Sequence, residues 1–180
     1  MRFTELSLKG AFVVDLDKIE DARGFFGRLW CENEFKSHDL NTNIVQSNVS
    51  FSKNKGTLRG MHFQKGVHAE TKFVRCTKGA VYDVIVDLRP DSPTFKKWCG
   101  VELTADNYRM IYVPENFAHA FLTLEDNSEV YYMVTQFYNK EHEGGLRYND
   151  PEIGINWPIE ITEVSDKDKN HPEFSLKHIL

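Results

Sequence analysis

Polar side chains interrupt an apolar stretch of the chain, LRGMHFQ at residues 58–64. A strand with a period of two would place His62 and Gln64 on one face and Met61 and Phe63 on the other. Because imidazole gains and loses a proton near neutral pH, His62 is a candidate general base. A single histidine is more often a hydrogen-bonded residue of the core, so the rest of the chain has to decide.

Two other segments carry polar residues that are unusual in a core, HAETKFVR (68–75) and VPENFAHAF (113–121). With His62, the histidine at position 119 could form a metal site inside a β-barrel. Gln64, however, occupies the place two residues after His62 where another imidazole would be expected, and a neutral amide is a poor ligand for a transition metal. The sequence therefore predicts no metal site.

The length and the net charge indicate the number of domains and argue against one class of partner. A length of 180 residues suits one domain, and we expect it to span residues 1–180. A formal net charge of −5 argues against a nucleic-acid partner, because such binding depends on a positive surface.

The start of the chain and the cysteines indicate the compartment. MRFTELSLKG at residues 1–10 has no apolar segment typical of a secretion signal, and no later run has the length of a membrane helix. Cys31, Cys76 and Cys99 are odd in number and widely spaced, so we interpret them as reduced core thiols. We expect a cytoplasmic protein with no membrane partner.

Short runs of β-branched and aromatic residues, separated by turn residues such as KNKG and RPDSP, dominate the chain. Strands that recur about every ten residues predict an all-β jelly-roll barrel. A helical pattern is confined to 31–40, so the helices should be short and peripheral, and the polar tail after Pro158 should wrap the surface or a partner subunit. Strands are expected at residues 11–16, 43–51, 72–77, 80–89, 98–103, 109–113, 120–124 and 129–138.

Eight motifs follow one another along nearly the whole chain. They are DARGFFGR (21–28), QSN (46–48), LRGMHFQ (58–64), HAETKFVR (68–75), GAVYDVIVDLRPDSPTFKKWCGVEL (79–103), VPENFAHAF (113–121), GLRYNDPEIGINWP (145–158) and SDKD (165–168). In order and spacing they resemble the dTDP-4-dehydrorhamnose 3,5-epimerase family. The resemblance implies a cupin-type jelly roll, a homodimer, no cofactor, and a nucleoside-diphosphate 4-keto sugar as the substrate.

The resemblance also implies the chemistry, in which a proton next to the C4 ketone is removed, an enolate forms, and a proton returns to the opposite face. It assigns His62 as the base, Asp168 as its orienting carboxylate, Tyr132 as the acid and Lys72 as the cation beside the enolate oxygen. Tyr131 should face the other side of its strand. The substrate-binding residues that it implies are Arg23, Phe26, Arg28, Gln46, Asn48, Arg59, His119, Tyr138, Glu143 and Lys167.

Two local questions stay open in the sequence. Strict alternation puts Arg59 opposite His62, unless Gly60 hosts a bulge or the strand edge brings both side chains into one cavity. Asp83 is a rival carboxylate that could partner either His62 or His119.

Position 28 departs from the family, which commonly has a glutamate that accepts a hydrogen bond from thymine. Arg28 can only donate, and guanine O6 and N7 would accept from it, unless the side chain points away from the site. We therefore expect a dTDP-linked or a GDP-linked 4-keto sugar, such as a heptose, used in surface-polysaccharide or deoxysugar biosynthesis. Whether C3, C5 or both are inverted stays open. The alternatives are a 3,4-ketoisomerase of related fold and a sugar-binding cupin without catalysis.

Overall fold

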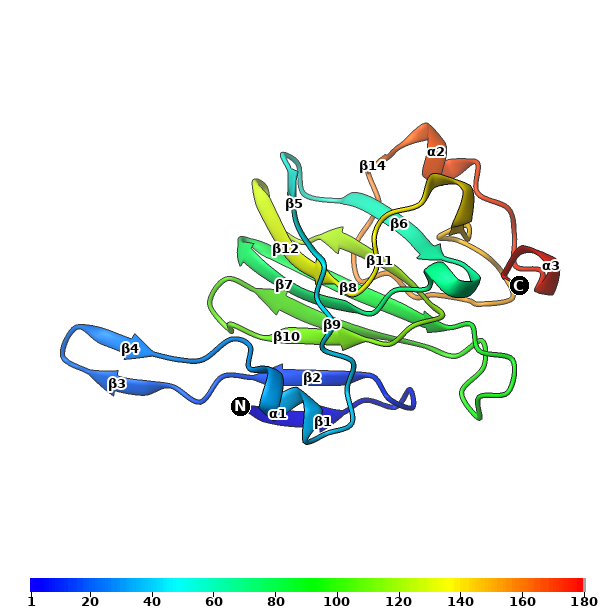
Figure 1. Ribbon diagram of the computed structural model, residues 1–180. Coiled ribbons are helices and arrows are strands. Elements are labelled where there is room, and N and C mark those ends of the chain that lie inside the picture. The colour runs from blue at the N-terminus through cyan, green and yellow to red at the C-terminus, as the bar shows by residue number, and fades with distance from the viewer. Residues whose placement is uncertain (180) are drawn as a thin grey trace.

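Two β-sheets packed face to face form the body of the molecule (Figure 1). The computed structural model describes residues 1–179. The first sheet contains, in spatial order, β1 (Arg2–Glu5), β2 (Phe12–Asp15), β10 (Met110–Val113), β7 (Lys72–Lys78), β12 (Ser128–Val134) and β5 (Gln46–Ser52). The second contains β13 (Glu143–Gly145), β6 (Thr57–Gln64), β11 (Phe117–Thr123), β8 (Ala80–Asp87) and β9 (Trp98–Thr104), with β14 (Glu163–Val164) parallel to β6. The predicted all-β jelly-roll fold is confirmed.

The main core lies between the sheets and follows the period-two pattern of the strands. Val74 of β7, Ile85 of β8 and Val130 of β12 are all buried in one cluster that draws on both sheets. Burial of each such side chain contributes roughly 1.5–3 kcal/mol relative to exposure. The inner face is therefore apolar over most of its area, and polar residues on it stand out as candidates for function.

Both outer faces are partly covered as well. Phe35, from α1 (Glu32–Lys36), is fully buried and packs edge-on against Phe73 of β7 at a ring distance of 5.2 Å. Met61 and Phe63 pack on the outer face of the second sheet, in a cluster that includes Leu146 and other residues of the C-terminal part. Their position confirms the alternation expected along β6.

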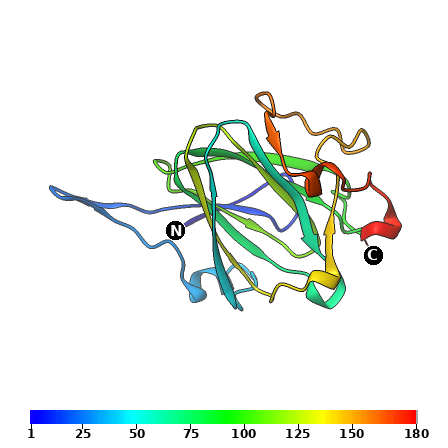
Figure 2. The same cartoon turned by 90° about the horizontal axis from the view of Figure 1, so that it is seen from above.

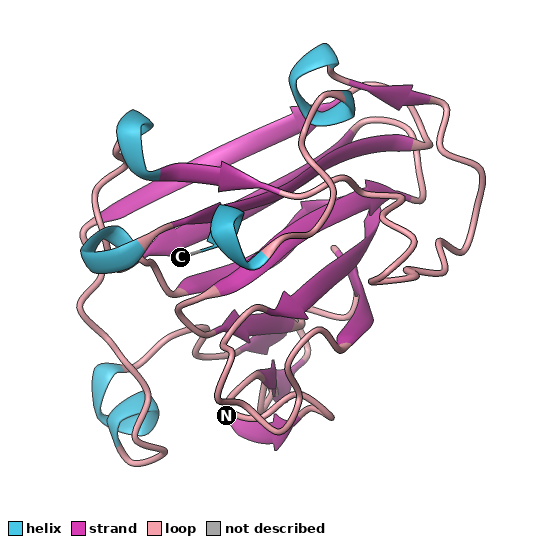
Figure 3. Cartoon of the chain, turned by 90° about the vertical axis from the view of Figure 1, so that its right-hand side faces the viewer, coloured by secondary structure: helices cyan, strands magenta, loops and turns pink. Residues whose placement is uncertain are grey.

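The helices are short and lie around the strands (Figure 3). α1 ends earlier than the 31–40 pattern predicts, because Asp39 adopts a left-handed backbone conformation with φ of 57°. The C-terminal tail carries α2 (Asp166–Lys169) and α3 (Leu176–Ile179). Within residues 1–179, no helix is long and apolar enough to cross a membrane.

The sequence missed a hairpin of β3 (Ile19–Asp21) and β4 (Gly24–Phe26), which projects from the body (Figures 1 and 2). Its side chains are unusually apolar for their exposure, since Ile19 is 69% and Phe26 67% exposed. Isolated two-stranded hairpins are marginal in water.

Several predicted boundaries also change. β12 ends at Val134 rather than at 138, because residues 135–139 leave the sheet and form a loop beside the end of β6. The three cysteines are free thiols, but Cys76 alone is buried, and Cys31 and Cys99 are partly exposed. Cys99 nevertheless packs against the core cluster that contains Cys76, so the prediction of core thiols is confirmed at these two positions.

Candidate active site

A bulge in β6 brings Arg59 and His62 to the same cavity. In the pairing with β11, His119 lies opposite His62 and Phe121 opposite Arg59, so β6 contains one extra residue over this span. Gly60 permits this path with a φ of +123°, and a Cβ on it would lie 2.5 Å from the Cβ of Ala120. The bulge that the sequence left open is confirmed.

The cavity lies on the inner face, between β6 and β11 of one sheet and β7 and β12 of the other. Its volume is about 390 Å³, within the range of small-molecule sites. The residues around it include Ser50, Leu58, Arg59, His62, Lys72, His119, Phe121, Tyr132, Lys167 and Asp168. All four predicted catalytic residues therefore meet in one place.

His62 and Asp168 form a close pair, with His62 Nε2 2.7 Å from Asp168 Oδ1. The N–H of Gly60 donates to Asp168 Oδ2 at 3.1 Å, and the Asp168 N–H donates to the side chain of Ser165, which caps α2. Burial disfavours the charge of Asp168, but the hydrogen bonds from His62 and Gly60 outweigh it and lower the pKa of Asp168 to about 2. The carboxylate is thus charged, and it can hold the ring and stabilise an imidazolium.

A second histidine–aspartate pair lies in the same cavity. His119 Nε2 is 2.8 Å from Asp83 Oδ2, and Asp83 is completely buried on β8. The rival carboxylate therefore partners His119 and not His62. A hydrogen bond between these two groups fixes the ring of His119 in the cavity wall.

Tyr132 and Lys72 face these histidines from the first sheet. They lie on neighbouring strands, where Tyr132 is opposite Val74 and Lys72 is opposite Val134. Burial raises the pKa of Tyr132, and the nearby carboxylate of Glu70 raises it further. The phenol is consequently protonated at neutral pH and able to donate. Tyr131 lies on the opposite face of β12, as expected.

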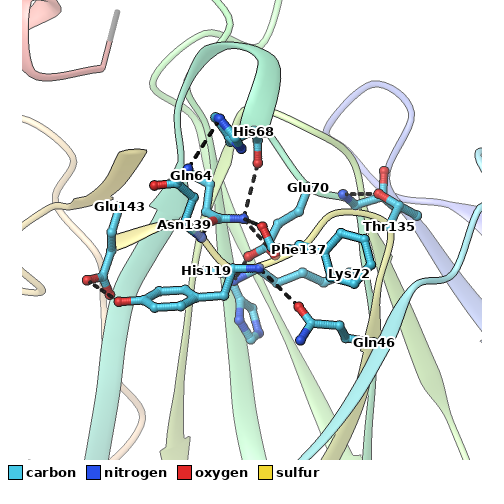
Figure 4. A network of polar contacts seen from close by, with 12 residues as sticks. Gln46, Gln64, His68, Glu70, Lys72, His119, Thr135, Phe137, Asn139 and Glu143 are labelled. Carbon is cyan, nitrogen blue, oxygen red and sulfur yellow. Dashed lines mark hydrogen bonds and ion pairs between the residues drawn. The ribbon is translucent and has the colours of Figure 1, made fainter. Parts of the chain in front are cut away.

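A chain of contacts joins four predicted binding residues at the rim. The N–H of Tyr138 donates to Gln46 Oε1 at 3.0 Å, and its hydroxyl donates to Glu143 Oε2 at 3.2 Å. Lys167 donates to the other oxygen of Glu143. Figure 4 shows Gln46 and Glu143 within this region of the molecule. Asn48 lies opposite Tyr132 in the β5–β12 pairing, on the inner face.

Three predicted binding residues do not reach this cavity. Arg23 pairs with Asp21 at 2.6 Å in the projecting hairpin, where Phe26 is also exposed. Arg28, just after that hairpin, lies 3.4 Å from Glu34. Because the hairpin extends away from the body, these side chains cannot serve the site of their own chain. The substrate-binding role of Arg23, Phe26 and Arg28 stays a prediction.

Sequence reasoning missed His171, which lies directly behind the His62–Asp168 pair. Its Nε2 is 3.5 Å from Asp168 Oδ1, and its ring packs where a Cβ on Gly145 would be. Burial, and next the proximity of His62, lower the pKa of His171. Ligand atoms of His62, Asp168 and His171 all lie within 4.8 Å of one another, so a metal ion would find its donors here. Nothing in the sequence around residue 171 signals this contact.

Sequence reasoning also assigned no role to Glu70, whose carboxylate is 3.0 Å from Lys72 Nζ. Its only signal in the sequence is its position two residues before the lysine.

Comparison with known proteins shows the class to which this chain belongs. It is an isomerase, a nucleotide-sugar 3,5-epimerase. The chain belongs to the dTDP-4-dehydrorhamnose 3,5-epimerase family, whose model matches residues 5–175. The resemblance in the motifs is thereby confirmed.

Individual relatives match along almost their whole length. The dTDP-4-dehydrorhamnose 3,5-epimerase of Sinorhizobium fredii is 43% identical over 173 residues, which cover 96% of this chain and 89% of the relative. The crystal structure of the Elizabethkingia anophelis epimerase has a TM-score of 0.96 and 41% identity, covering 99% of this chain and 98% of that one. A Legionella pneumophila epimerase solved with dTDP-4-keto-L-rhamnose has a TM-score of 0.89 and 33% identity, covering 96% and 92%.

Proposed function

We propose that this protein converts a dTDP-linked 4-keto-6-deoxy sugar to dTDP-4-dehydrorhamnose by inverting C3 and C5, in deoxysugar biosynthesis. The observation that carries the proposal is the His62–Asp168 pair at 2.7 Å, which faces Tyr132 and Lys72 across one cavity. The names of relatives that match nearly the whole chain support the same reaction and substrate.

The proposed mechanism uses one residue for each requirement. Because Asp168 engages Nε2 of His62, Nδ1 takes the proton from the carbon next to the ketone, and the charged Asp168 stabilises the imidazolium that forms. The Lys72 ammonium balances the negative charge that develops on the C4 oxygen. Tyr132 returns a proton from the opposite sheet, which inverts the centre. Lys72 does what a Lewis acid would otherwise do, so we propose catalysis without a metal ion.

We further propose that the active protein is a homodimer in which the hairpin of one chain completes the cavity of its partner. Arg23 and Phe26 lie too far from their own cavity to act there, and the hairpin exposes apolar side chains. On the outer face of the first sheet, Val49 and Phe51 of β5 are also exposed, at 61% and 43%. Together these surfaces would bury apolar area between two copies.

The nucleotide is the finer part of the proposal. The names of the relatives favour dTDP, whereas the donors of Arg28 would suit guanine. Since Arg28 lies beside Glu34 and outside its own cavity, it could meet a base only in the site of a partner chain. We propose that the substrate is a dTDP-linked sugar. A preference for the GDP-linked sugar would contradict this proposal.

A panel of dTDP- and GDP-linked 4-keto sugars in deuterated buffer, followed by proton and carbon NMR, tests the function. We expect deuterium at both C3 and C5 of the dTDP-sugar, and incorporation that is at least about 10²-fold slower with His62→Asn. A carbonyl that moves from C4 to C3 would identify a ketoisomerase, and binding without any exchange would identify a non-catalytic cupin.

Two further arms of this assay test the details. If Arg28 reads the base, Arg28→Glu should favour dTDP-sugars over GDP-sugars by about 5- to 150-fold in kcat/KM, since a mismatched polar group costs about 1–3 kcal/mol. An unchanged preference would exclude Arg28 from base recognition. Activity should also survive exhaustive chelation. Activity that is lost with EDTA and restored by one divalent ion would contradict the metal-free mechanism and direct attention to His171.

A further inference from the structure

Lys72 is held in the cavity by an ion pair that the mechanism above does not use. Its Nζ lies 3.0 Å from Glu70 Oε1, and the two side chains are only 10% and 12% exposed. The backbone between them is fixed by two hydrogen bonds, from the Thr71 N–H to Thr135 Oγ1 and from the Thr135 N–H to the Thr71 carbonyl. Figure 4 shows Glu70 and Lys72 side by side in this network. The position of Glu70 is therefore determined, and with it the position of the ammonium group.

Gln64 fixes the other side of Glu70. Its Nε2 donates to Glu70 Oε2 at 3.2 Å and to the carbonyls of His68 and Phe137 at 3.1 and 3.3 Å. Its Oε1 accepts from the Asn139 N–H at 2.6 Å, so the partners define which end of the amide is which. Gln64 is 4% exposed and lies two residues beyond His62, on the same face of β6. The strand that carries the base thus also anchors the carboxylate behind Lys72.

The charge of Glu70 also reaches the proposed acid. Two charges act on the pKa of Tyr132, that of Glu70 beside Lys72 and that of Arg59 on β6. The other charged and titratable groups that line the same cavity are His62, Lys72, His119, Glu163, Lys167 and Asp168. Of the two charges that act on the pKa of Tyr132, Glu70 is the negative one, and it acts against loss of the phenolic proton. Arg59 acts in the opposite direction.

We propose that Glu70 is a positioning residue of the epimerase: held by Gln64, it keeps the Lys72 ammonium turned into the cavity and places a negative charge near the Tyr132 hydroxyl. The inference rests on the proposed function, because it assigns Glu70 a role through the two groups that handle the enolate oxygen and the returning proton. Glu70 itself stands behind Lys72 and needs no contact with the sugar.

The test compares Glu70→Gln, which keeps the size of the side chain and loses the charge, with Glu70→Asp, which keeps the charge and draws it back. With the dTDP-4-keto sugar, Glu70→Gln should lower kcat by about 10-fold or more while KM stays within about 2-fold, because a misplaced group costs rate more than binding. The alkaline limb of the pH profile, where kcat falls as the pH rises, should also lie at a lower pH in Glu70→Gln than in the wild type. Glu70→Asp should lower kcat but leave the alkaline limb at the pH of the wild type. Glu102→Gln, an exposed change on β9, serves as the control and should alter neither.

A second measurement does not depend on turnover. Tyrosinate absorbance is titrated in the wild type and in Glu70→Gln, each with its Tyr132→Phe counterpart subtracted to isolate one of the seven tyrosines. The titration of Tyr132 should move to lower pH in Glu70→Gln. If it does not move, or if kcat and the alkaline limb are unchanged, the role of Glu70 is refuted even though the enzyme is active. If it moves while the wild type exchanges no proton of any 4-keto sugar, the proposed function fails and the charge coupling stands. If Glu70→Gln does not fold, Glu70→Asp alone decides. An alkaline limb that lies at a lower pH in Glu70→Asp than in the wild type would refute the proposal.

Discussion

At the scale of single residues, His62 carries the sharpest expectation because its partner is defined. His62→Asn should lower turnover by at least about 10²-fold, the low end for loss of a general base. The fold should survive, since the His62 side chain is 34% exposed and faces the cavity. Deuterium incorporation at C3 and C5 measures the loss, and circular dichroism checks the fold. Exchange at both centres near the wild-type rate would remove His62 from the mechanism.

Tyr132 tests the second half of the reaction. Tyr132→Phe removes the hydroxyl and leaves the ring, so His62 can still abstract a proton while reprotonation on the far face fails. We expect deuterium wash-out from the substrate, or a partly epimerised sugar, with little fully inverted product in the NMR spectrum. If Tyr132→Phe forms the same fully inverted product as the wild type, at the same rate, the acid is another group.

At the scale of elements, the bulge in β6 should depend on Gly60. In Gly60→Ala the new Cβ would meet the Cβ of Ala120 at 2.5 Å and the carbonyl of His119 at 2.6 Å. Gly66→Ala is the matched control, because Gly66 also has a positive φ, of 57°, but no atom lies within 4 Å of its added Cβ. We expect Gly60→Ala to lose about 1–3 kcal/mol more unfolding free energy than the control. Equal urea midpoints would mean that β6 adapts without cost.

Asp168, which joins α2 to β6, should make the unfolding free energy depend on pH in the acid range. The pKa of this carboxyl is about 2 in the folded protein, below its ordinary 3.8. A lowered pKa adds stability above the unfolded value, and the stability is lost as pH falls through the folded value. The contribution of Asp168 should thus be roughly 2 kcal/mol above pH ~4 and disappear towards pH ~2.

Urea unfolding of the wild type and Asp168→Asn between these pH values measures the effect. The gap between the two proteins should narrow as the pH falls. Asp166→Asn, on the same helix but with a side chain that is 97% exposed, should show no such gap. A gap that is independent of pH would mean that the charge of Asp168 does not hold the helix.

At the scale of the whole molecule, mixed dimers can tell whether Arg23 serves its own chain or its partner. Arg23→Ala and His62→Asn should each be nearly inactive alone, and sedimentation should show dimers. After the two are dissociated and reassociated together, half of the dimers would contain one intact shared site, which restores about a quarter of the wild-type activity. No recovery would mean that Arg23 acts within its own subunit, whereas an Arg23→Ala protein that is fully active alone would mean that Arg23 has no role.

What the sequence determined by itself was local. Period-two alternation, turn residues and the LRGMHFQ stretch were enough to predict most strands of the jelly roll and to place His62 and Gln64 on one face. Each of these features depends on residues close together in the chain. The short hairpin at residues 19–26 escaped this reasoning because its strands have only three residues each.

Only the tertiary structure decided which polar groups meet. Asp168 reaches His62 across 106 residues, while Asp83 goes to His119, and both choices depend on the register of β6 and β11 around one extra residue. His171 and Glu70 reach the site through the same packing, although the chain around them gives little sign of it. Alternation specifies the face on which a side chain lies, whereas its partner is fixed by the position of other strands and of the tail, which no local pattern encodes.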